Sequence, residues 1–212
     1  MAPCQDHGVN EKRTTSSYAV LGLLSVQSWT TYELAKQVRR SLNWFWPRAE
    51  RKLFDEPKRL VEQGLATASK QMTGQRPKTV YTISDKGRTA LHDWLTEPAA
   101  PRTMEFEAMV KVFFADAGTL EQLLTTLTRV EQEATERLAT LNGLADMTGL
   151  RFPERAHLSA LTLRLQFEQE HAVHRWATWA TAQVTQWTST TNSGKWDTPA
   201  QFAELEDPTP KP

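Results

Sequence analysis

The first half of the chain begins with two stretches whose apolar positions recur at helical spacing. SSYAVLGLLSVQS places Tyr18, Leu21 and Leu24 on one side, which predicts a first helix. A second helix is expected from a capping box at Thr30 and Glu33, because each of these side chains can bond the backbone amide of the other residue. We expect this helix to end near residue 40.

A third helix is predicted after a short aromatic connection. Pro47 suits a first helical position, where a missing amide hydrogen has no cost, and Gly64 provides a helix end. Pro57 lies within this stretch and should divide it, because proline cannot donate the helical hydrogen bond. We expect Asp55 to cap the second part.

The pattern then changes to strand-like alternation. LATASKQ and TVYTIS are rich in β-branched residues and flank a turn-prone basic segment at 72–78, which predicts a β-hairpin. Ser84 should open a fourth helix, with Leu91, Trp94 and Leu95 on one face. Three helices, a basic-tipped hairpin and a closing helix are the order of a winged helix-turn-helix domain.

The second half is helical throughout. Residues 104–115 are apolar on a broad face, residues 120–141 follow a 3-4 pattern, and Pro153 introduces a long helix to about Thr188. The apolar residues of this last helix share a stripe of roughly 80 degrees at about 100 degrees per residue. They are Leu158, Leu161, Leu165, Ala172, Trp176, Trp179 and Trp187. We expect this stripe, apart from the small Ala172, to pack against a second copy of the chain.

These elements predict a mainly α fold with two domains. A winged helix-turn-helix domain is expected at 15–96, and an all-α dimerisation and effector domain at 103–188. The Pro/Ala-rich interruption near residue 100 separates the two. Residues 1–14 and 189–212 are polar, without helical period, and are expected to be flexible tails.

The charge is distributed unevenly between these halves. The net charge is zero, yet residues 1–95 carry 15 Lys and Arg against 9 Asp and Glu, and residues 96–212 carry 10 against 16. A basic half joined to an acidic half is expected when one domain approaches phosphates.

Composition excludes several other classes. No apolar run is long enough to span a membrane, and the first residues lack the apolar core of a signal peptide, so we expect a cytoplasmic protein. The single cysteine, Cys4, allows neither an internal disulfide nor a cysteine-based zinc site. No catalytic triad pattern, phosphate-binding glycine loop or HExxH motif is present, so we expect neither an enzyme nor a bound cofactor.

Four segments together resemble the winged domain of the PadR family. They are YAVLGLLS at 18–25, TTYELAKQVRRSL at 30–42, WPRAERKLFDEPKRLVEQGLA at 46–66, and GQRPKTVYTISDKGRTAL at 74–91. FEAMVKVFFADAGTLEQL at 106–123 is similar to the start of the C-terminal helical domain in longer members. The resemblance implies a homodimeric repressor that is often released from DNA by phenolic or other aromatic molecules.

DNA contact requires an exposed helix with cationic side chains and a second attachment to the backbone. We expect the third helix to enter the major groove, the hairpin tip to grip the flanking strand, and the second helix to cross the backbone. The predicted contacts are Tyr32, Lys36, Arg48, Arg51, Lys52, Lys58, Gln75, Arg76 and Lys78. For each residue alone, a solvated charged face is the competing interpretation.

Two further sites are weighed on the last helix. Trp176 and Trp179 could sandwich a flat aromatic effector, although aromatics at helical spacing more often form core. Glu154–His157 and Glu168–His171 resemble the metal-binding pairs of di-iron bundles, but both pairs lie on one helix and further inward glutamates are lacking. We therefore expect no metal.

The sequence predicts a transcriptional regulator that binds double-stranded DNA as a homodimer at a pseudo-palindromic operator, and most simply a repressor released by a small aromatic ligand. The alternative is a ligand- or metal-binding helical dimer whose winged domain contacts protein.

Overall fold

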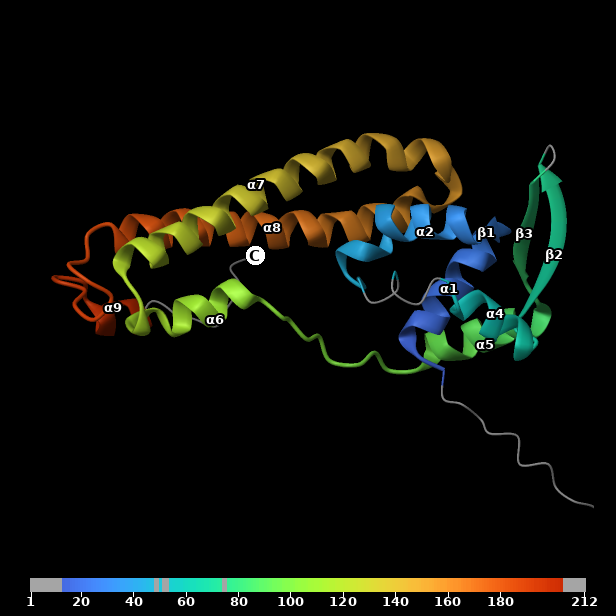
Figure 1. The fold of residues 1–212 in the computed structure, drawn as a ribbon, viewed down its shortest axis with the longest axis horizontal. Helices are drawn as coiled ribbons and strands as arrows, with labels where there is room; N and C mark the ends of the chain where they lie inside the picture. Colours follow the sequence, from blue (N-terminus) through green and yellow to red (C-terminus); the bar gives the residue numbers. More distant parts are fainter. Residues whose placement is uncertain (1–12, 48–49, 51–53, 74–75, 204–212) are drawn as a thin grey trace, which may run out of the picture. The chain divides into compact units, whose positions relative to one another are not determined.

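The computed structural model describes residues 13–47, 50, 54–73 and 76–203, and divides the chain into one unit up to Pro101 and another from Arg102 (Figure 1). The first unit combines short helices with a three-stranded antiparallel sheet of order β1-β3-β2. Its elements are α1 (Thr15–Val26), β1 (Trp29–Thr30), α2 (Thr31–Arg40), the 3-10 turn η1 (Leu42–Trp44), α4 (Glu56–Glu62), β2 (Ala66–Thr73), β3 (Arg76–Ile83) and α5 (Asp85–Thr96).

Side-chain caps start α1, α2 and α5, and the caps of α2 and α5 lie where the sequence predicts them. The Thr30 amide donates to Glu33 Oε2 at 2.8 Å, and the Glu33 amide donates to Thr30 Oγ1 at 3.2 Å, so the predicted capping box is confirmed. Ser84 caps α5 by accepting the Gly87 amide at 3.0 Å. Thr14 forms a further capping box on α1.

The core of the first unit joins all of its layers. It consists of fully or almost fully buried apolar side chains from α1, β1, α2, α4 and the sheet, namely Val20, Leu21, Leu24, Trp29, Leu34, Val38, Leu60, Leu65, Tyr81 and Ile83. The Trp29 indole also donates to the Leu23 carbonyl at 2.7 Å, which satisfies its buried N–H group. The base of the hairpin therefore packs in the same core as the helices.

Two glycines shape the junction between α4, the sheet and α5. Gly64 follows α4 with φ of 71°, a conformation that L side chains rarely adopt, and this confirms the predicted helix end. Gly87 lies so close to β2 that a Cβ atom there would be 2.0 Å from the Leu65 carbonyl oxygen.

One detail of the prediction for this unit is wrong. Asp55 precedes α4 but makes no side-chain capping bond, because its backbone is already helical rather than extended. On the predicted face of α5, Leu91 and Trp94 are half-buried and Leu95 is 68% exposed, and the buried positions of this helix are Gly87 and Ala90. Pro57 occupies the first turn of α4, as expected of the division at this residue.

The second unit is helical, and its two long helices lie side by side (Figure 1). Its elements are α6 (Glu107–Phe113), the 3-10 turn η2 (Ala115–Ala117), α7 (Leu120–Arg151), the 3-10 turn η3 (Pro153–Arg155), α8 (Ala156–Val184) and α9 (Thr198–Ala203). The buried cluster between α7 and α8 contains Leu123, Leu127, Ala180 and Val184. Apart from the short elements β1 and α9, the order of helices and strands is the one that the sequence predicts for a winged domain followed by long helices.

Polar contacts also join α7 to α8. Arg137 Nε lies 2.6 Å from Glu170 Oε1, and the Glu170 side chain is only 11% exposed. Further along the pair, Thr178 Oγ1 donates to Glu131 Oε1 at 2.7 Å. The two helices are therefore held in register by specific bonds as well as by apolar packing.

The segment after α8 corrects the expectation of a flexible tail over 189–212, because residues 189–203 are folded. The Trp187 and Trp196 rings lie 5.3 Å apart, and Thr190 Oγ1 donates to the Gly118 carbonyl at 3.2 Å. Two large aromatic rings and a long-range hydrogen bond offset the polar composition of this stretch. Residues 204–212 and 1–12 lie outside the described residues.

No helix among the described residues is both long and apolar enough to cross a bilayer.

Candidate DNA-binding surface

The start of α2 presents an aromatic hydroxyl and an amine to solvent. Tyr32 is 78% exposed in the first turn, and Lys36 is exposed one turn later. The Thr30–Glu33 capping box starts the helix just before Tyr32, and the N-terminus of a helix favours anions such as phosphate. The structure therefore leaves both predicted α2 residues accessible to DNA.

Lys58 is the predicted contact that the structure describes on the third-helix segment. Its side chain is exposed in the first turn of α4, whereas the neighbouring Glu56 and Pro57 are buried against the core. Burial of these neighbours fixes which side of α4 faces solvent. Arg48, Arg51 and Lys52, which the sequence also predicts as contacts, lie outside the described residues.

An ion pair holds the end of α2 to the segment that follows it. Arg39 Nε lies 2.6 Å from Glu50 Oε1. Both side chains are partly exposed, so the pair contributes less than about 1 kcal/mol to stability. Its geometric effect is to place residue 50 next to α2, and sequence reasoning missed it because the partners are eleven residues apart.

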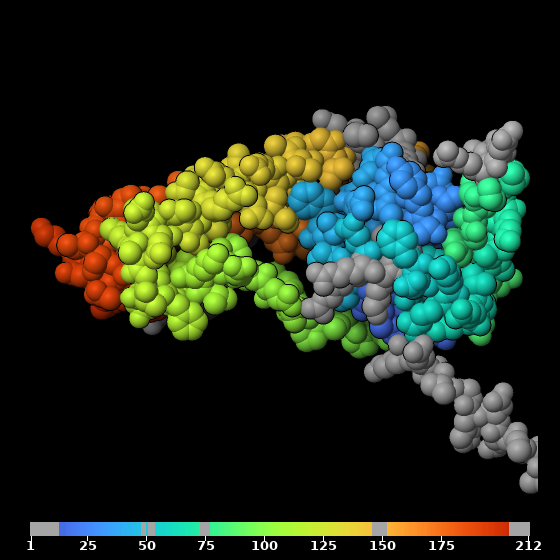
Figure 2. Space-filling view, in the orientation of Figure 1, coloured from blue at the N-terminus to red at the C-terminus, as the bar shows by residue number. Residues whose placement is uncertain are grey.

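The hairpin, which is coloured green in Figure 2, carries lysines on both of its faces. Lys78 lies opposite Gln71 in the antiparallel register, and Lys70 lies opposite Thr79. Since strand side chains alternate, Lys78 shares a strand face with position 76, and Lys70 projects to the other face. Lys70 was missed as a candidate because its strand was read as a plain alternating segment.

Two further predicted wing residues are described only in part or not at all. The backbone of Arg76 pairs with Thr73 at the end of the ladder. Gln75 lies outside the described residues. An antiparallel ladder that carries Lys70 and Lys78 is the kind of element that a second attachment to the DNA backbone requires.

The structure places Trp176 and Trp179 in different surroundings. Trp176 packs against the buried Leu123 cluster between α7 and α8, as does Trp187, whereas Trp179 is 44% exposed. A ligand sandwich would need both rings free on the same side. The stripe that the sequence predicts for dimerisation is thus divided, with Leu158, Leu161, Leu165 and Trp179 exposed and the other two tryptophans used within the chain.

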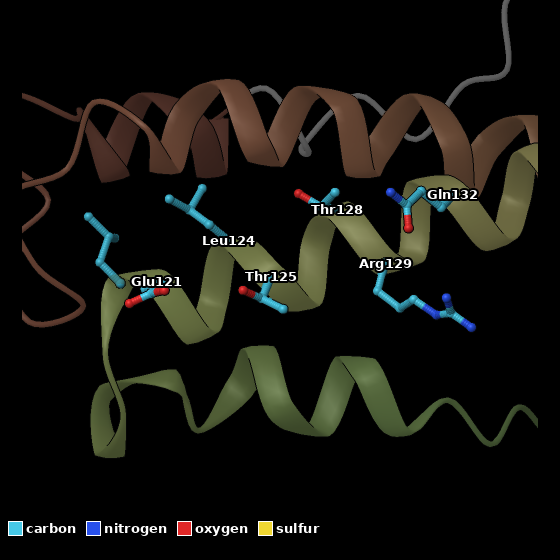
Figure 3. A pocket seen from close by; sticks show the side chains of 7 residues that line it. Glu121, Leu124, Thr125, Thr128, Arg129 and Gln132 are labelled. Carbon is cyan, nitrogen blue, oxygen red and sulfur yellow. The ribbon is translucent and has the colours of Figure 1, made fainter.

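A shallow groove of about 640 Å³ follows the first turns of α7, and neither Trp176 nor Trp179 lines it (Figure 3). Leu120 and Leu124 supply its apolar part, and Thr125, Thr128 and Arg129 supply polar groups. All of its lining residues come from one helix, so it does not enclose a small molecule as ligand sites usually do. Among the described residues, no group of three or more His, Cys, Asp or Glu side chains could hold a metal ion.

Each of the two units matches the model of a known protein family. Residues 20–93 match the model of the transcriptional regulator PadR-like family, and residues 106–185 match the model called virulence activator alpha C-term. The winged unit therefore matches the PadR-like family, and the helical unit matches a different model. The second match confirms the longer type, in which a helical domain follows the winged domain.

Bacillus subtilis supplies the similar proteins that are most informative about this PadR-like chain. Its negative transcriptional regulator PadR is 27% identical over 163 residues, which cover 73% of this chain and 90% of the relative. The crystal structure of that protein with operator DNA matches at 25% identity and a TM-score of 0.70, covering 81% of this chain and 99% of that one. Its structure with p-coumaric acid matches over the same shares at 25% identity and a TM-score of 0.64. The PadR-like chain is therefore a transcriptional regulator with the predicted winged-helix fold.

Proposed function

We propose that this regulator is a homodimeric repressor that binds a pseudo-palindromic operator through its winged domains. The observation that carries the proposal is that exposed Tyr32 and Lys36 on α2, exposed Lys58 on α4 and half-buried Lys78 on the hairpin all belong to one winged unit. The B. subtilis relative is named a negative regulator and is known in complex with operator DNA, which supports the same activity here.

Each predicted contact has a distinct role in this proposal. The third-helix segment, with Arg48, Arg51, Lys52 and Lys58, reads base edges in the major groove, where short helical segments fit. Tyr32 and Lys36 hold one phosphate strand, and Gln75, Arg76 and Lys78 hold the flanking strand. Two such units, about 34 to 36 Å apart, read one face of the duplex.

Dimerisation and release complete the proposal. The exposed part of the α8 stripe supplies the surface for a second copy, and Trp176 and Trp187 support it from within the chain. A small aromatic acid is the proposed effector class, because the B. subtilis relative is known in complex with p-coumaric acid. We propose further that the protein acts in the cytoplasm and has no catalytic activity.

Fluorescence anisotropy with the DNA directly upstream of the gene tests the proposal. If about six to eight phosphates are neutralised per dimer, log affinity should fall with log salt concentration at a slope of roughly −5 to −7. Unrelated DNA should bind at least about a thousand-fold more weakly at physiological salt. A flat salt response, or equal affinity for both DNAs, would contradict the proposal that the protein is a sequence-specific repressor.

Two lysine-to-alanine variants, one on the wing and one in the second unit, test whether the wing itself contacts DNA. Lys78→Ala should weaken binding and reduce the magnitude of the salt slope by about 1 for each copy that loses a phosphate contact. Lys195→Ala removes an exposed amine from the second unit and should leave both quantities unchanged. Adding p-coumarate to the complex tests the effector class separately, since DNA binding does not depend on its outcome.

A further inference from the structure

The hairpin carries an exposed apolar pair close to its tip. Met72 of β2 lies opposite Pro77 of β3 in the antiparallel register, so both side chains project from the same face of the ladder. Met72 is 65% exposed, and Pro77 is exposed as well. Single exposed apolar residues are common on protein surfaces. Two that face each other on one ladder form a small apolar surface, which we call the wing-tip pair.

The wing-tip pair lies well beyond the core that supports the hairpin. On the same face, Ala66 and Ile83 are buried at the base, and the next pair of residues includes the buried Tyr81. Met72 follows four residues after Ala68, which is the partner of Tyr81. At about 3.3 Å per residue, the wing-tip pair lies about 13 Å further along the ladder than Tyr81. The pair therefore does not belong to the core of the winged unit.

The charged residues of the hairpin are all cationic. Residues 66–83 contain Lys70, Arg76 and Lys78 and no aspartate or glutamate. Lys70 is exposed and projects from the same face as Met72, two residues nearer to the base. An apolar surface among cationic side chains is complementary to a nucleic acid, in which phosphates flank an apolar stack of bases. Charge therefore favours DNA as the partner of the wing-tip pair.

The dimensions of the duplex indicate how the hairpin meets it. Next to a major groove that holds a helix, the same face of the duplex presents the minor groove about half a helical turn away, or roughly 17 Å. The minor groove is about 7.5 Å deep, so a hairpin that projects about 13 Å beyond its core reaches the floor. The groove is only about 6 Å wide, however, and two strands about 4.8 Å apart with side chains on both faces do not fit unless it opens. Entry of the tip therefore requires the DNA to deform.

We propose that the wing-tip pair enters the minor groove beside each half-site and partly unstacks one base step, so that the regulator selects a deformable operator flank. Methionine and proline are among the side chains that minor-groove proteins insert between base pairs, which bends the DNA toward the major groove. Pyrimidine–purine steps such as TA unstack most easily, so we expect one of them at this position. The inference rests on the proposed function and adds a second source of sequence preference, which acts without hydrogen bonds to bases.

Fluorescence of 2-aminopurine tests the unstacking with the full chain and the DNA directly upstream of the gene. Hydroxyl-radical footprinting first locates the protected minor grooves, and adenines within them are then replaced one at a time. Because stacking quenches this probe, binding of the parent chain should raise the fluorescence at one step in each flank at least about three-fold. Met72→Thr should remove most of that rise, whereas Met72→Leu, which keeps an apolar side chain, should retain it.

A second methionine provides the matched control. Met104 lies in the second unit and is 79% exposed, so Met104→Thr makes the same chemical change away from the wing. This variant should leave the fluorescence rise and the affinity for the upstream DNA unchanged. Equal losses in Met72→Thr and Met104→Thr would contradict a specific role of the wing.

Altered flanks test the preference for a deformable step. Replacing the affected step by AA should weaken binding of the parent chain about ten-fold, whereas Met72→Thr should bind the two DNAs to within about two-fold of each other. Gel mobility of circularly permuted fragments should show a bend of at least about 20 degrees at each flank with the parent chain and a smaller bend with Met72→Thr. Pro77→Thr should change the bend in the same direction. An unbent complex of the parent chain would overturn the proposal.

The outcomes separate this inference from the proposed function. A chain that does not bind DNA overturns both. Preferential binding of the upstream DNA without a fluorescence rise, or with a rise that Met72→Thr leaves unchanged, overturns the insertion of the wing-tip pair alone. A rise that depends on Met72, in a chain that binds unrelated DNA equally well, supports the insertion and overturns only the sequence-specific repressor.

Discussion

Replacing Gly87 by alanine tests whether the junction between α5 and β2 sets the position of the wing. An alanine Cβ would lie 2.0 Å from the Leu65 carbonyl oxygen and 2.9 Å from Ile83 Cγ1. The carbonyl cannot move freely, because it accepts the Ser84 amide at 3.0 Å. The backbone of α5 or of the hairpin base must therefore shift.

The magnitude follows from three contributions. Forcing a methyl group into a filled site costs about 1 to 3 kcal/mol, and weakening the bond from Ser84 to Leu65 adds about 1 kcal/mol. Alanine is a better helix former than glycine by about 1 kcal/mol, which offsets part of this cost. The net loss is roughly 2 kcal/mol, which lowers the unfolding temperature of a unit of about 100 residues by roughly 8 to 16 °C.

Calorimetry of the full chain measures this effect against a matched control. Gly22 is also within a helix, but an added Cβ there meets no atom within 4 Å. Gly22→Ala should therefore raise the stability of the same unit by about 0.5 to 1 kcal/mol. If Gly87→Ala were as stable as the parent chain, the close approach would not determine the packing of the wing.

Three further changes test other parts of the structure. Thr30→Ala removes the capping box of α2 and should cost about 1 kcal/mol in urea unfolding, and an unchanged midpoint would contradict its role. Lys58→Ala should weaken operator binding more than binding to unrelated DNA in anisotropy titrations, whereas an equal loss would assign Lys58 to the phosphates. Arg137→Met leaves the nearly buried Glu170 carboxylate without this partner and should cost about 2 kcal/mol in urea unfolding. Replacing both residues by methionine should recover most of that loss, and no recovery would show that the pair does not account for it.

Features that depend on neighbouring residues could be predicted from the sequence. The Thr30–Glu33 capping box, the helix end at Gly64 and the division at Pro57 are each decided within four residues, because side-chain caps and backbone conformations act locally. The hairpin and the long helices follow for the same reason from their periodicity.

Features that depend on distant residues could not be predicted. The two-residue strand β1 exists only because β3, about fifty residues later, pairs with it. The folded segment beyond α8 depends on contacts of Trp187 with Trp196 and of Thr190 with Gly118. Periodicity also placed Trp176 and Trp179 on one stripe, although α7 covers only the first of them.

The candidate site was predicted in its residue types rather than in its geometry. Tyr32, Lys36 and Lys58 are accessible as expected, since charged and polar groups avoid burial. Lys70 was overlooked because exposure in a strand depends on which face meets the core. The contribution of each residue to DNA binding stays a prediction.

Thr30 belongs to two elements at once, and this limits how the winged unit can change its shape. Its backbone belongs to β1, which pairs with Val80 of the wing strand, while its side chain caps α2. The winged unit is therefore expected to move as one rigid body, because tilting the wing alone would break the pairing of β1 with β3 and strain the cap of α2 at the same residue. In the proposed homodimer, we therefore expect an effector that releases the operator to change the spacing or angle between the two winged units.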